Sequence, residues 1–268
     1  MRIIISPAKK MNSDPESLEY TGMPVFLEDT QHILNWMQKL SYQDARKLWG
    51  CNEKIAEQNY ERIRHMDLYR NLTPAVLSYE GIQYQYMAPA VFEDKMLEYV
   101  QEHLRILSGF YGVLKPMDGV RPYRLEMQAR AAIEGKDNLY AFWNSRLYGE
   151  VIDLDRTIIN LASKEYSKCI EAYLRPEDNM ITCIFGEMEG SRVVQKGTYA
   201  KMARGEMVRF MAMNRVERAQ DLQQFEGLGY GFSRELSSGR EYVFLRNAGQ
   251  TDHDGSCLAN WELAGSKV

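Results

Sequence analysis

The sequence has little cysteine, and its few cysteines are too widely separated to indicate a site. The four are Cys51, Cys169, Cys183 and Cys257, with no C-x-x-C pair among 268 residues. A chain of this length with so few cysteines is not a disulfide scaffold, and a reducing, cytoplasmic location is expected. The four histidines show no H-E-x-x-H or other paired spacing. We therefore predict no metal site and no cofactor, although ligands that converge only in the folded chain would escape this test.

The sequence also lacks long hydrophobic runs and an excess of charge of one sign. Its apolar stretches are a few residues long, far short of the roughly 20 that span a bilayer, so no membrane partner is expected. The first residues contain no apolar core of signal-peptide length. With 33 basic and 37 acidic residues, the net charge is −4. This balance excludes binding of nucleic acid by bulk charge but allows a local basic patch.

Apolar runs and turn signals predict helices and strands in alternation. Strands are predicted over 2–5, 75–79 and 157–161, and β-hairpins over 180–195 and 229–245. Helices are predicted over 92–104, 139–154, from Ser163 onward, over 199–218, and three times within 28–67. This mixture predicts a mixed α/β (α+β) fold, in which a single domain over 1–246 has a central mixed sheet and a helical lobe at about 28–67. The small, polar residues 247–268 predict a weakly ordered tail.

Capping signals mark a helix–turn–helix unit inside the predicted lobe. Ser41 begins a capping box, Gly50 stands at a helix end, and Asn52 can cap the next helix. Such a unit can present turn amides and a helix N-terminus to phosphate. Its acidic and basic residues nearly balance and its turn has one glycine, so a plain packed helical pair is the stronger interpretation.

Basic residues gather in two stretches, near 105–130 and between Arg192 and Arg218. The second stretch has seven basic residues, opposed only by two glutamates. On a helical wheel, Lys201, Arg204 and Arg215 fall on one side of the predicted helix. The apolar side of that helix is formed by Tyr199, Ala203, Met207, Phe210 and Met213. The basic side is either a solvated face or the binding surface for nucleic-acid backbone or a phosphorylated small molecule.

The Ser6–Lys9 string reads S-x-x-K, the nucleophile pattern of penicillin-binding proteins. That chemistry needs the serine at a helix start, whereas Ser6 ends a predicted strand and the companion motifs are missing. A loop that presents Ser6 and Lys9 to an anion is the better interpretation.

The segment Pro122–Met127 carries a second polar pattern. If it is extended, Arg124 and Glu126 lie on one face and Tyr123 and Leu125 on the other. The charged pair is either a structural ion pair or part of a polar site. The glycine-bearing turns elsewhere match no nucleotide-binding fingerprint.

Five strings in a fixed order carry a resemblance to a known family. They are Ile4–Lys9, Leu107–Asp118, Pro122–Met127, Asn160–Tyr166 and Tyr199–Met207. Together they resemble the YaaA family of bacterial peroxide-stress-resistance proteins, over about residues 1–246. The resemblance implies a cytoplasmic protein that helps cells survive hydrogen peroxide and limits iron-driven oxidative damage. It also implies a single-domain fold with a positively charged cleft, a helix-hairpin-helix-like element at about 36–66, and binding to double-stranded DNA. It brings no established catalytic mechanism.

Two functional hypotheses follow. In the first, a basic cleft binds the phosphate backbone of double-stranded DNA without base specificity. Its expected lining is Lys9, Arg121, Arg124, Lys201, Arg204 and Arg209. In the second, an enzyme acts on a small phosphorylated or carboxylated ligand in the same cleft. Its candidate catalytic residues are Ser6, Tyr123, Glu126, Asn160, Glu165 and Tyr166. A deep pocket that joins these residues favours the enzyme, and a long shallow groove favours DNA. An iron-handling or protein-interaction role is a third, plainer alternative.

Overall fold

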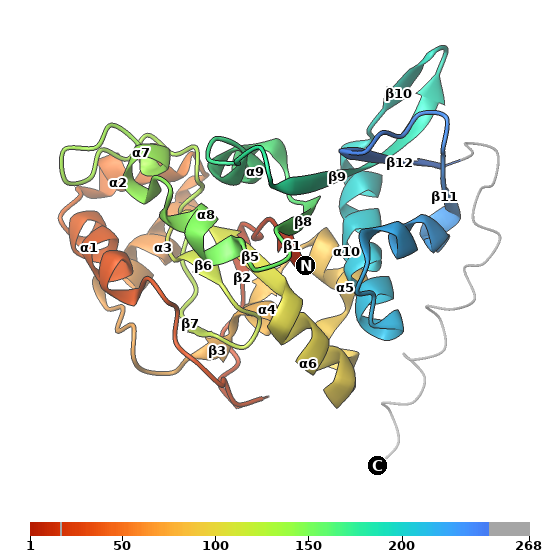
Figure 1. Cartoon of the computed structure of the whole chain (residues 1–268). Coiled ribbons are helices and arrows are strands. Elements are labelled where there is room, and N and C mark those ends of the chain that lie inside the picture. The colour runs from red at the N-terminus through yellow and green to blue at the C-terminus, as the bar shows by residue number, and fades with distance from the viewer. Residues whose placement is uncertain (17, 247–268) are drawn as a thin grey trace.

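Within residues 1–16 and 18–246, which the computed structural model describes, eight strands form a mixed central sheet (Figure 1). Its middle is parallel, in the order β12–β9–β8–β1–β5. The bounds are β1 Arg2–Ile5, β5 Leu104–Ser108, β8 Thr157–Leu161, β9 Asn179–Glu189 and β12 Glu241–Arg246. The antiparallel strands are β6 Gly112–Leu114 beside β5, β10 Arg192–Val194 beside β9, and β11 Tyr230–Phe232 beside β12. The mixed α/β fold and both hairpins are confirmed. The predicted tail, 247–268, lies outside the described residues.

The strand order changes direction between β1 and β8. From β1 the chain passes to β5 on one side, and it later returns to β8 on the other side before continuing to β9 and β12. In open parallel sheets, connections that leave two neighbouring strands in opposite directions open a crevice beyond the carboxyl ends of those strands. The topology therefore singles out the space beyond Ile5 and Leu161.

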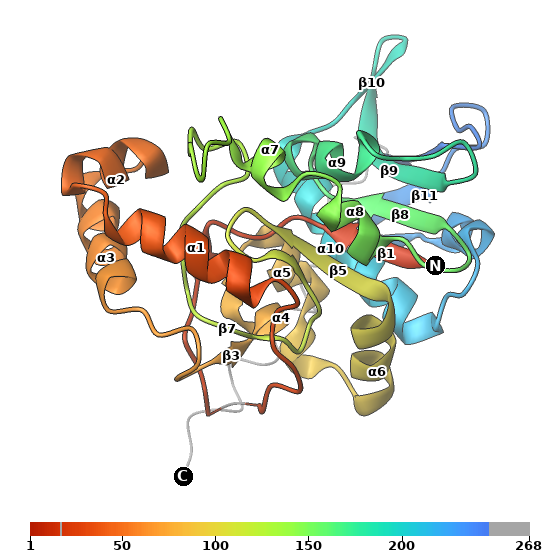
Figure 2. The ribbon, with the colours of Figure 1, turned by 60° about the vertical axis from the view of Figure 1, so that its left-hand side comes forward.

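Helices cover both faces of the sheet, which explains the unbroken apolar run of β1. Ile3, Ile4 and Ile5 have no exposed surface, as expected for a strand covered on both sides. One face carries α5, α6 and α10, and the other carries α8 and α9 (Figure 2). Their bounds are α5 Ile82–Met87, α6 Asp94–His103, α8 Arg146–Val151, α9 Lys164–Glu171 and α10 Gly197–Asn214.

The predicted helical lobe is present as α1 Leu27–Gln38, α2 Tyr42–Trp49 and α3 Glu53–Arg64. Its capping predictions are confirmed. The backbone N–H of Asp44 donates to Ser41 Oγ at 3.2 Å, and that of Ile55 donates to Asn52 Oδ1 at 3.0 Å. Gly50 ends α2 in the left-handed region, with φ of 53°, a conformation that glycine adopts without steric cost.

The strand predicted over 75–79 is wrong. Ala75–Ser78 forms the short helix α4, between β3 Thr73–Pro74 and β4 Tyr79–Glu80. The N–H groups of Ala75 and Val76 donate to loop carbonyls of Asp118 and Pro116, both at 2.9 Å. A short run of mostly buried residues has no periodicity by which a strand can be told from a helix.

The helix predicted over 139–154 is interrupted. Leu139–Trp143 forms α7, and Asn144, with φ of 52°, separates it from α8. The remaining short elements are β2 Lys10–Met11, β7 Gly119–Val120, η1 Pro89–Val91, η2 Ala219–Gln224 and η3 Gly227–Gly229. The buried apolar residues form one continuous cluster that includes those of the helical lobe.

Candidate functional site

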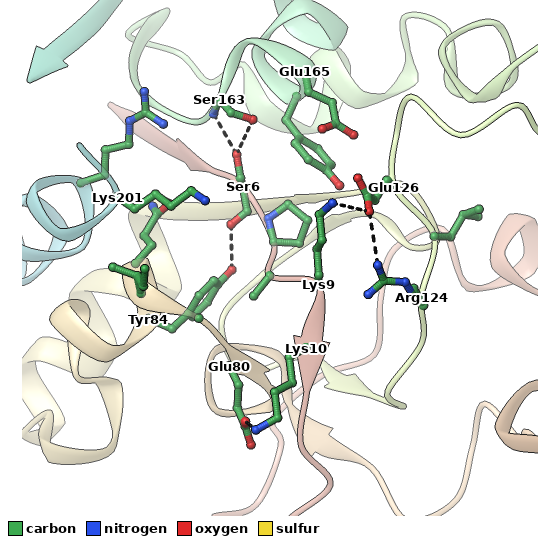
Figure 3. Close-up of a pocket in the computed structure, with 18 of the residues that line it drawn as sticks. Ser6, Lys9, Lys10, Glu80, Tyr84, Arg124, Glu126, Ser163, Glu165 and Lys201 are labelled. Carbon is green, nitrogen blue, oxygen red and sulfur yellow. Dashed lines mark hydrogen bonds and ion pairs between the residues drawn. The ribbon is translucent and has the colours of Figure 1, made fainter. Parts of the chain in front are cut away.

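Two serines meet where the strand order reverses. Ser6 follows β1, and Ser163 follows β8 at the start of α9. The Ser6 hydroxyl accepts a hydrogen bond from the backbone N–H of Ser163 at 2.8 Å and donates to Ser163 Oγ at 3.1 Å (Figure 3). On the other side of the loop, the Tyr84 hydroxyl donates to the Ser6 carbonyl at 3.0 Å. These bonds fix the loop at the mouth of the crevice.

A cavity of about 550 Å³ opens at this point. Its walls come from the loop after β1, the start of α5, the extended segment 123–126, the first turn of α9 and the side of α10. The polar residues from these elements that line it are Ser6, Lys9, Gln83, Arg124, Glu126, Ser163, Glu165, Lys201 and Arg204, and β2 and β4 add Lys10 and Glu80. Segments that are distant in the sequence thus contribute to one enclosed polar site.

The wall formed by the segment 123–126 alternates as predicted. Tyr123 and Leu125 are buried, whereas Arg124 and Glu126 face the cavity. Glu126 Oε1 lies 2.8 Å from Lys9 Nζ and 3.8 Å from Arg124 Nη2. Glu126 therefore stands between two cations.

Glu165 lies beside this group in the first turn of α9. It accepts a hydrogen bond from the backbone N–H of Gln128 at 3.2 Å, and none of the ion pairs among the described residues includes it. Burial raises the pKa of Glu165, and the charge of Glu126 adds to this effect. Glu165 is thus a carboxyl group that faces the cavity and is held by backbone donors, with Lys9 near enough to lower its pKa slightly but no ion pair among the described residues.

The wall formed by α10 carries two positively charged side chains, Lys201 and Arg204. Lys201 is exposed, and among the residues that the structure describes it makes no ion pair or hydrogen bond. Arg204 is partly buried, and its Nη2 donates a long hydrogen bond to Gln195 Oε1 at 3.4 Å. Within the described residues, the Nε of Arg204 and the Nε2 of Gln83, which lines the same cavity, are buried without partners. Burial lowers the pKa of Arg204.

A close helix contact places this wall. A Cβ atom on Gly205 would lie 2.0 Å from the Gln83 carbonyl oxygen, so α10 reaches α5 only with glycine at this position. The contact sets Arg204 against the cavity. Of the two alternatives left for the cationic side, Arg204 lies in a cavity wall and is not a fully solvated side chain, whereas Tyr199 and Met213, predicted on the apolar side, are exposed. A helical wheel assigns sides but cannot tell which neighbours cover each side.

The comparison with known proteins decides the family. A family model described as peroxide stress protein YaaA matches residues 1–236. The chain belongs to this YaaA family.

Similar proteins cover nearly all of the described residues. The UPF0246 protein of Agathobacter rectalis is 60% identical over 92% of this chain and 99% of its own length. The UPF0246 proteins of Lachnoclostridium phytofermentans and Pediococcus pentosaceus are each 52% identical, over 92% of this chain and 96% and 98% of their own lengths. The resemblance seen in the sequence is therefore confirmed at the level of the family.

Most of the predicted site residues of this YaaA-family chain line the cavity, but three do not. Arg121 Nη1 donates to the Asn71 carbonyl at 2.9 Å, away from the cavity. Asn160 is buried in β8, where its side chain donates to Thr182 Oγ1 at 3.1 Å and accepts from the Ala162 N–H. Arg209 lies on α10 beyond the cavity wall and close enough to Glu206 to lower the pKa of that carboxyl, against the larger effect of burial.

The two candidate tyrosines, Tyr123 and Tyr166, line the cavity and are buried. The Tyr123 hydroxyl is hydrogen-bonded to Ser108 Oγ at 2.6 Å and to the Tyr79 hydroxyl at 2.9 Å. Burial raises the pKa of Tyr123 to about 12 and that of Tyr166 well above its usual value. Both therefore stay protonated near neutral pH and act as donors or as walls rather than as bases.

Sequence reasoning missed Gln83 and Tyr84 as site residues. Both belong to α5, whose short span carries no charge and no motif. Only the packing of α5 against α10 brings them to the cavity. Ser163 was recognisable as a helix start after a strand, but its contact with Ser6 follows from the sheet order.

Two further findings concern the described part of this YaaA-family chain. No helix there is long and apolar enough to cross a membrane. No group of three or more His, Cys, Asp and Glu side chains within 1–16 and 18–246 is arranged to hold a metal ion.

Proposed function

We propose that this peroxide stress protein binds a small phosphorylated or carboxylated ligand in the cavity beyond β1 and β8. The observation that carries the proposal is Arg204, a partly buried guanidinium that lines the cavity, has a buried Nε without a partner and pairs with no carboxylate among the described residues. Burying a cation without a counterion costs several kcal/mol. Arginine offers a planar fork that suits phosphate and carboxylate, so an anionic ligand would offset this cost.

The shape of the cavity supports a small ligand. Its volume of about 550 Å³ is within the range of roughly 300–1,000 Å³ common for small-molecule sites. The polar candidates Ser6, Glu126 and Glu165 lie in it beside Lys9 and Lys201. A binding site for phosphate backbone has no need of enclosed carboxylates, whereas a site for a specific ligand uses them to orient it. This arrangement favours the enzyme hypothesis over the DNA hypothesis.

The test is ligand-induced stabilisation of the purified protein. A thermal-shift screen with inorganic phosphate, nucleotides, sugar phosphates and dicarboxylates should find at least one stabilising compound. A ligand at 100 times its Kd adds about 2.7 kcal/mol to the stability of the folded state. R204M and K201M should reduce the shift. The matched control is R209M, which removes a cation from the same helix outside the cavity. Equal shifts for all three variants, or no shift with any compound, would refute the proposal.

Binding of double-stranded DNA is the second candidate, favoured by cations that remain exposed. Lys9 and Lys201 lie at the cavity rim, and Arg46 and Lys47 flank a shallow hollow at the Gly50 turn, the unit predicted to resemble a helix-hairpin-helix. Arg124 and Arg204 are partly buried and therefore less accessible to duplex phosphates than these exposed cations. A labelled duplex titrated with salt gives the number of phosphate contacts. K9M and K201M should each lower the slope of log K against log salt by about one, and an unchanged slope would remove this candidate.

The cellular role that we propose is cytoplasmic and limits iron-driven oxidative damage. Family membership and the free thiols Cys51, Cys169 and Cys183 support it. A strain that lacks the gene, complemented with wild type, K201M or R209M, would be scored for survival in hydrogen peroxide and for unincorporated iron. If the cavity carries the role, only K201M should fail to complement. Equal complementation by both variants would separate the cellular role from the cavity.

A further inference from the structure

We propose that the ligand of the cavity is a phosphate monoester that bears hydroxyl groups, bound with its phosphate at Lys201 and Arg204 and with a hydroxyl on Glu165. This inference rests on the proposed function and names the class of ligand. Sugar phosphates and nucleoside monophosphates share this chemistry.

The cavity has two chemically different walls. Figure 3 shows Lys201 on one side, with Glu165, Glu126, Lys9 and Arg124 on the other and the Ser6–Ser163 contact between them. Arg204 lies one turn after Lys201 on α10 and lines the same cavity. A ligand that fills the space therefore touches both walls.

The two walls differ in net charge. On the wall of Glu126, the ion pairs with Lys9 and Arg124 and the extra carboxyl of Glu165 leave opposite charges in equal number. At the mouth, Lys10 and Glu80 form an ion pair. The uncompensated charge is that of Lys201 and Arg204. Two cations match a phosphate monoester, which carries about −1.5 to −2 at neutral pH, better than they match a single carboxylate.

The position of Glu165 specifies the other end of the ligand. Its carboxyl is held by backbone N–H groups and forms no ion pair among the described residues, while the nearby Lys9 is paired with Glu126. Beside Glu126, a second anionic group of the ligand would be repelled. A hydroxyl group fits, because it donates a hydrogen bond to a carboxylate and adds no charge to a wall that is already balanced.

The Ser6 and Ser163 hydroxyls fit the same ligand. They lie between the walls and bond to each other; Ser6 keeps one lone pair after accepting the Ser163 N–H, and Ser163 keeps one lone pair and its own O–H donor. A polyhydroxyl body can therefore lie across them. A phosphate monoester with hydroxyl groups can contact both walls at once. Inorganic phosphate is too small to do so and can occupy only the end of the cavity at Lys201.

The experiment is isothermal titration calorimetry of the full chain with five probes. They are inorganic phosphate, ribose 5-phosphate, 2-deoxyribose 5-phosphate, adenosine 5′-monophosphate and ribose. We expect the Kd of ribose 5-phosphate or of the nucleotide to be at least tenfold lower than that of inorganic phosphate, with no measurable binding of ribose. The preferred probe tells a sugar phosphate from a nucleotide. The deoxy compound reports whether the 2-hydroxyl is the group on Glu165.

The variant E165Q keeps the side-chain shape and removes the charge. It should reduce the tenfold preference to less than threefold without weakening the binding of inorganic phosphate, because it removes a negative charge from the cavity. E165D, which keeps the charge, serves as a second variant and should retain part of the preference. E171Q is the control on the same helix, because Glu171 bonds to Lys164 and Ser167 outside the cavity.

The outcomes separate this inference from the proposed function. If no phosphate or carboxylate compound binds, the proposed function fails. If inorganic phosphate binds as tightly as the esters, or if E165Q and E165D leave the preference intact, only the hydroxyl inference is overturned.

Discussion

The hydroxyl of Ser6 accepts a hydrogen bond from the backbone N–H of Ser163 at 2.8 Å. This bond joins the loop after β1 to the first turn of α9. The segments that leave the neighbouring strands β1 and β8 in opposite directions are therefore hydrogen-bonded to each other where they begin. The cavity walls that carry Lys9 and Glu165 begin on either side of this bond.

Replacing Ser6 by alanine tests this connection. S6A leaves the Ser163 N–H without its acceptor, and a part-buried N–H that loses its partner costs about 1–3 kcal/mol. We expect a loss of unfolding free energy in that range from urea denaturation. S163A is the comparison, because it keeps the N–H bond and removes only the contact between the hydroxyls. Equal losses for the two variants would show that the backbone bond contributes nothing.

The close contact between α10 and α5 predicts that adding one methyl group at Gly205 lowers the stability of the protein strongly. In G205A the new Cβ would lie 2.0 Å from the Gln83 carbonyl oxygen, so the helices must separate. Overpacking of this kind costs about 1–3 kcal/mol or more, and the separation would also displace Arg204. Thermal denaturation should show a clear fall in Tm for G205A and almost none for G197A, since Gly197 on the same helix has nothing within 4 Å of a new Cβ.

The buried Asp118 predicts a pH dependence of stability. Burial raises the pKa of Asp118 to about 6, from an ordinary value near 3.8, although the Lys115 N–H donates to its carboxylate. The folded state then binds the proton more tightly than the unfolded state, so this carboxyl lowers stability as pH rises from about 4 to about 6. D118N removes the titration. The difference in unfolding free energy between D118N and wild type should grow in favour of D118N over that range, and a constant difference would contradict this assignment.

The burial of each cysteine predicts which thiols can react. Burial raises the pKa of Cys169 and of Cys183 to about 12, so neither forms a reactive thiolate near neutral pH. Cys51 is partly exposed at the end of α2. In a C257S background, brief treatment of the folded protein with iodoacetamide should modify Cys51 alone, as read by peptide mass spectrometry. Rapid modification of Cys183 would show that the sheet opens near Arg204.

Local sequence signals correctly predicted the elements whose causes lie within a few residues. Ser41, Gly50 and Asn52 set helix ends because capping involves only neighbouring backbone groups. The alternation from Tyr123 to Glu126 followed from the geometry of an extended chain. The segment 75–79 was misassigned because it is short and mostly buried, so that it carries no polar–apolar pattern that distinguishes helix from strand.

The sequence by itself determined the mixed α/β class, the two hairpins, the capped helical lobe and most of the charged residues of the cavity. The tertiary structure alone decided the strand order, the meeting of Ser6 with Ser163, the position of Arg204 in the cavity wall, and the absence of Arg121, Asn160 and Arg209 from the cavity lining. The reason is the range of the forces involved. Caps and alternation arise from bonds and angles between neighbours, whereas sheet order and helix contacts depend on how distant apolar surfaces pack together.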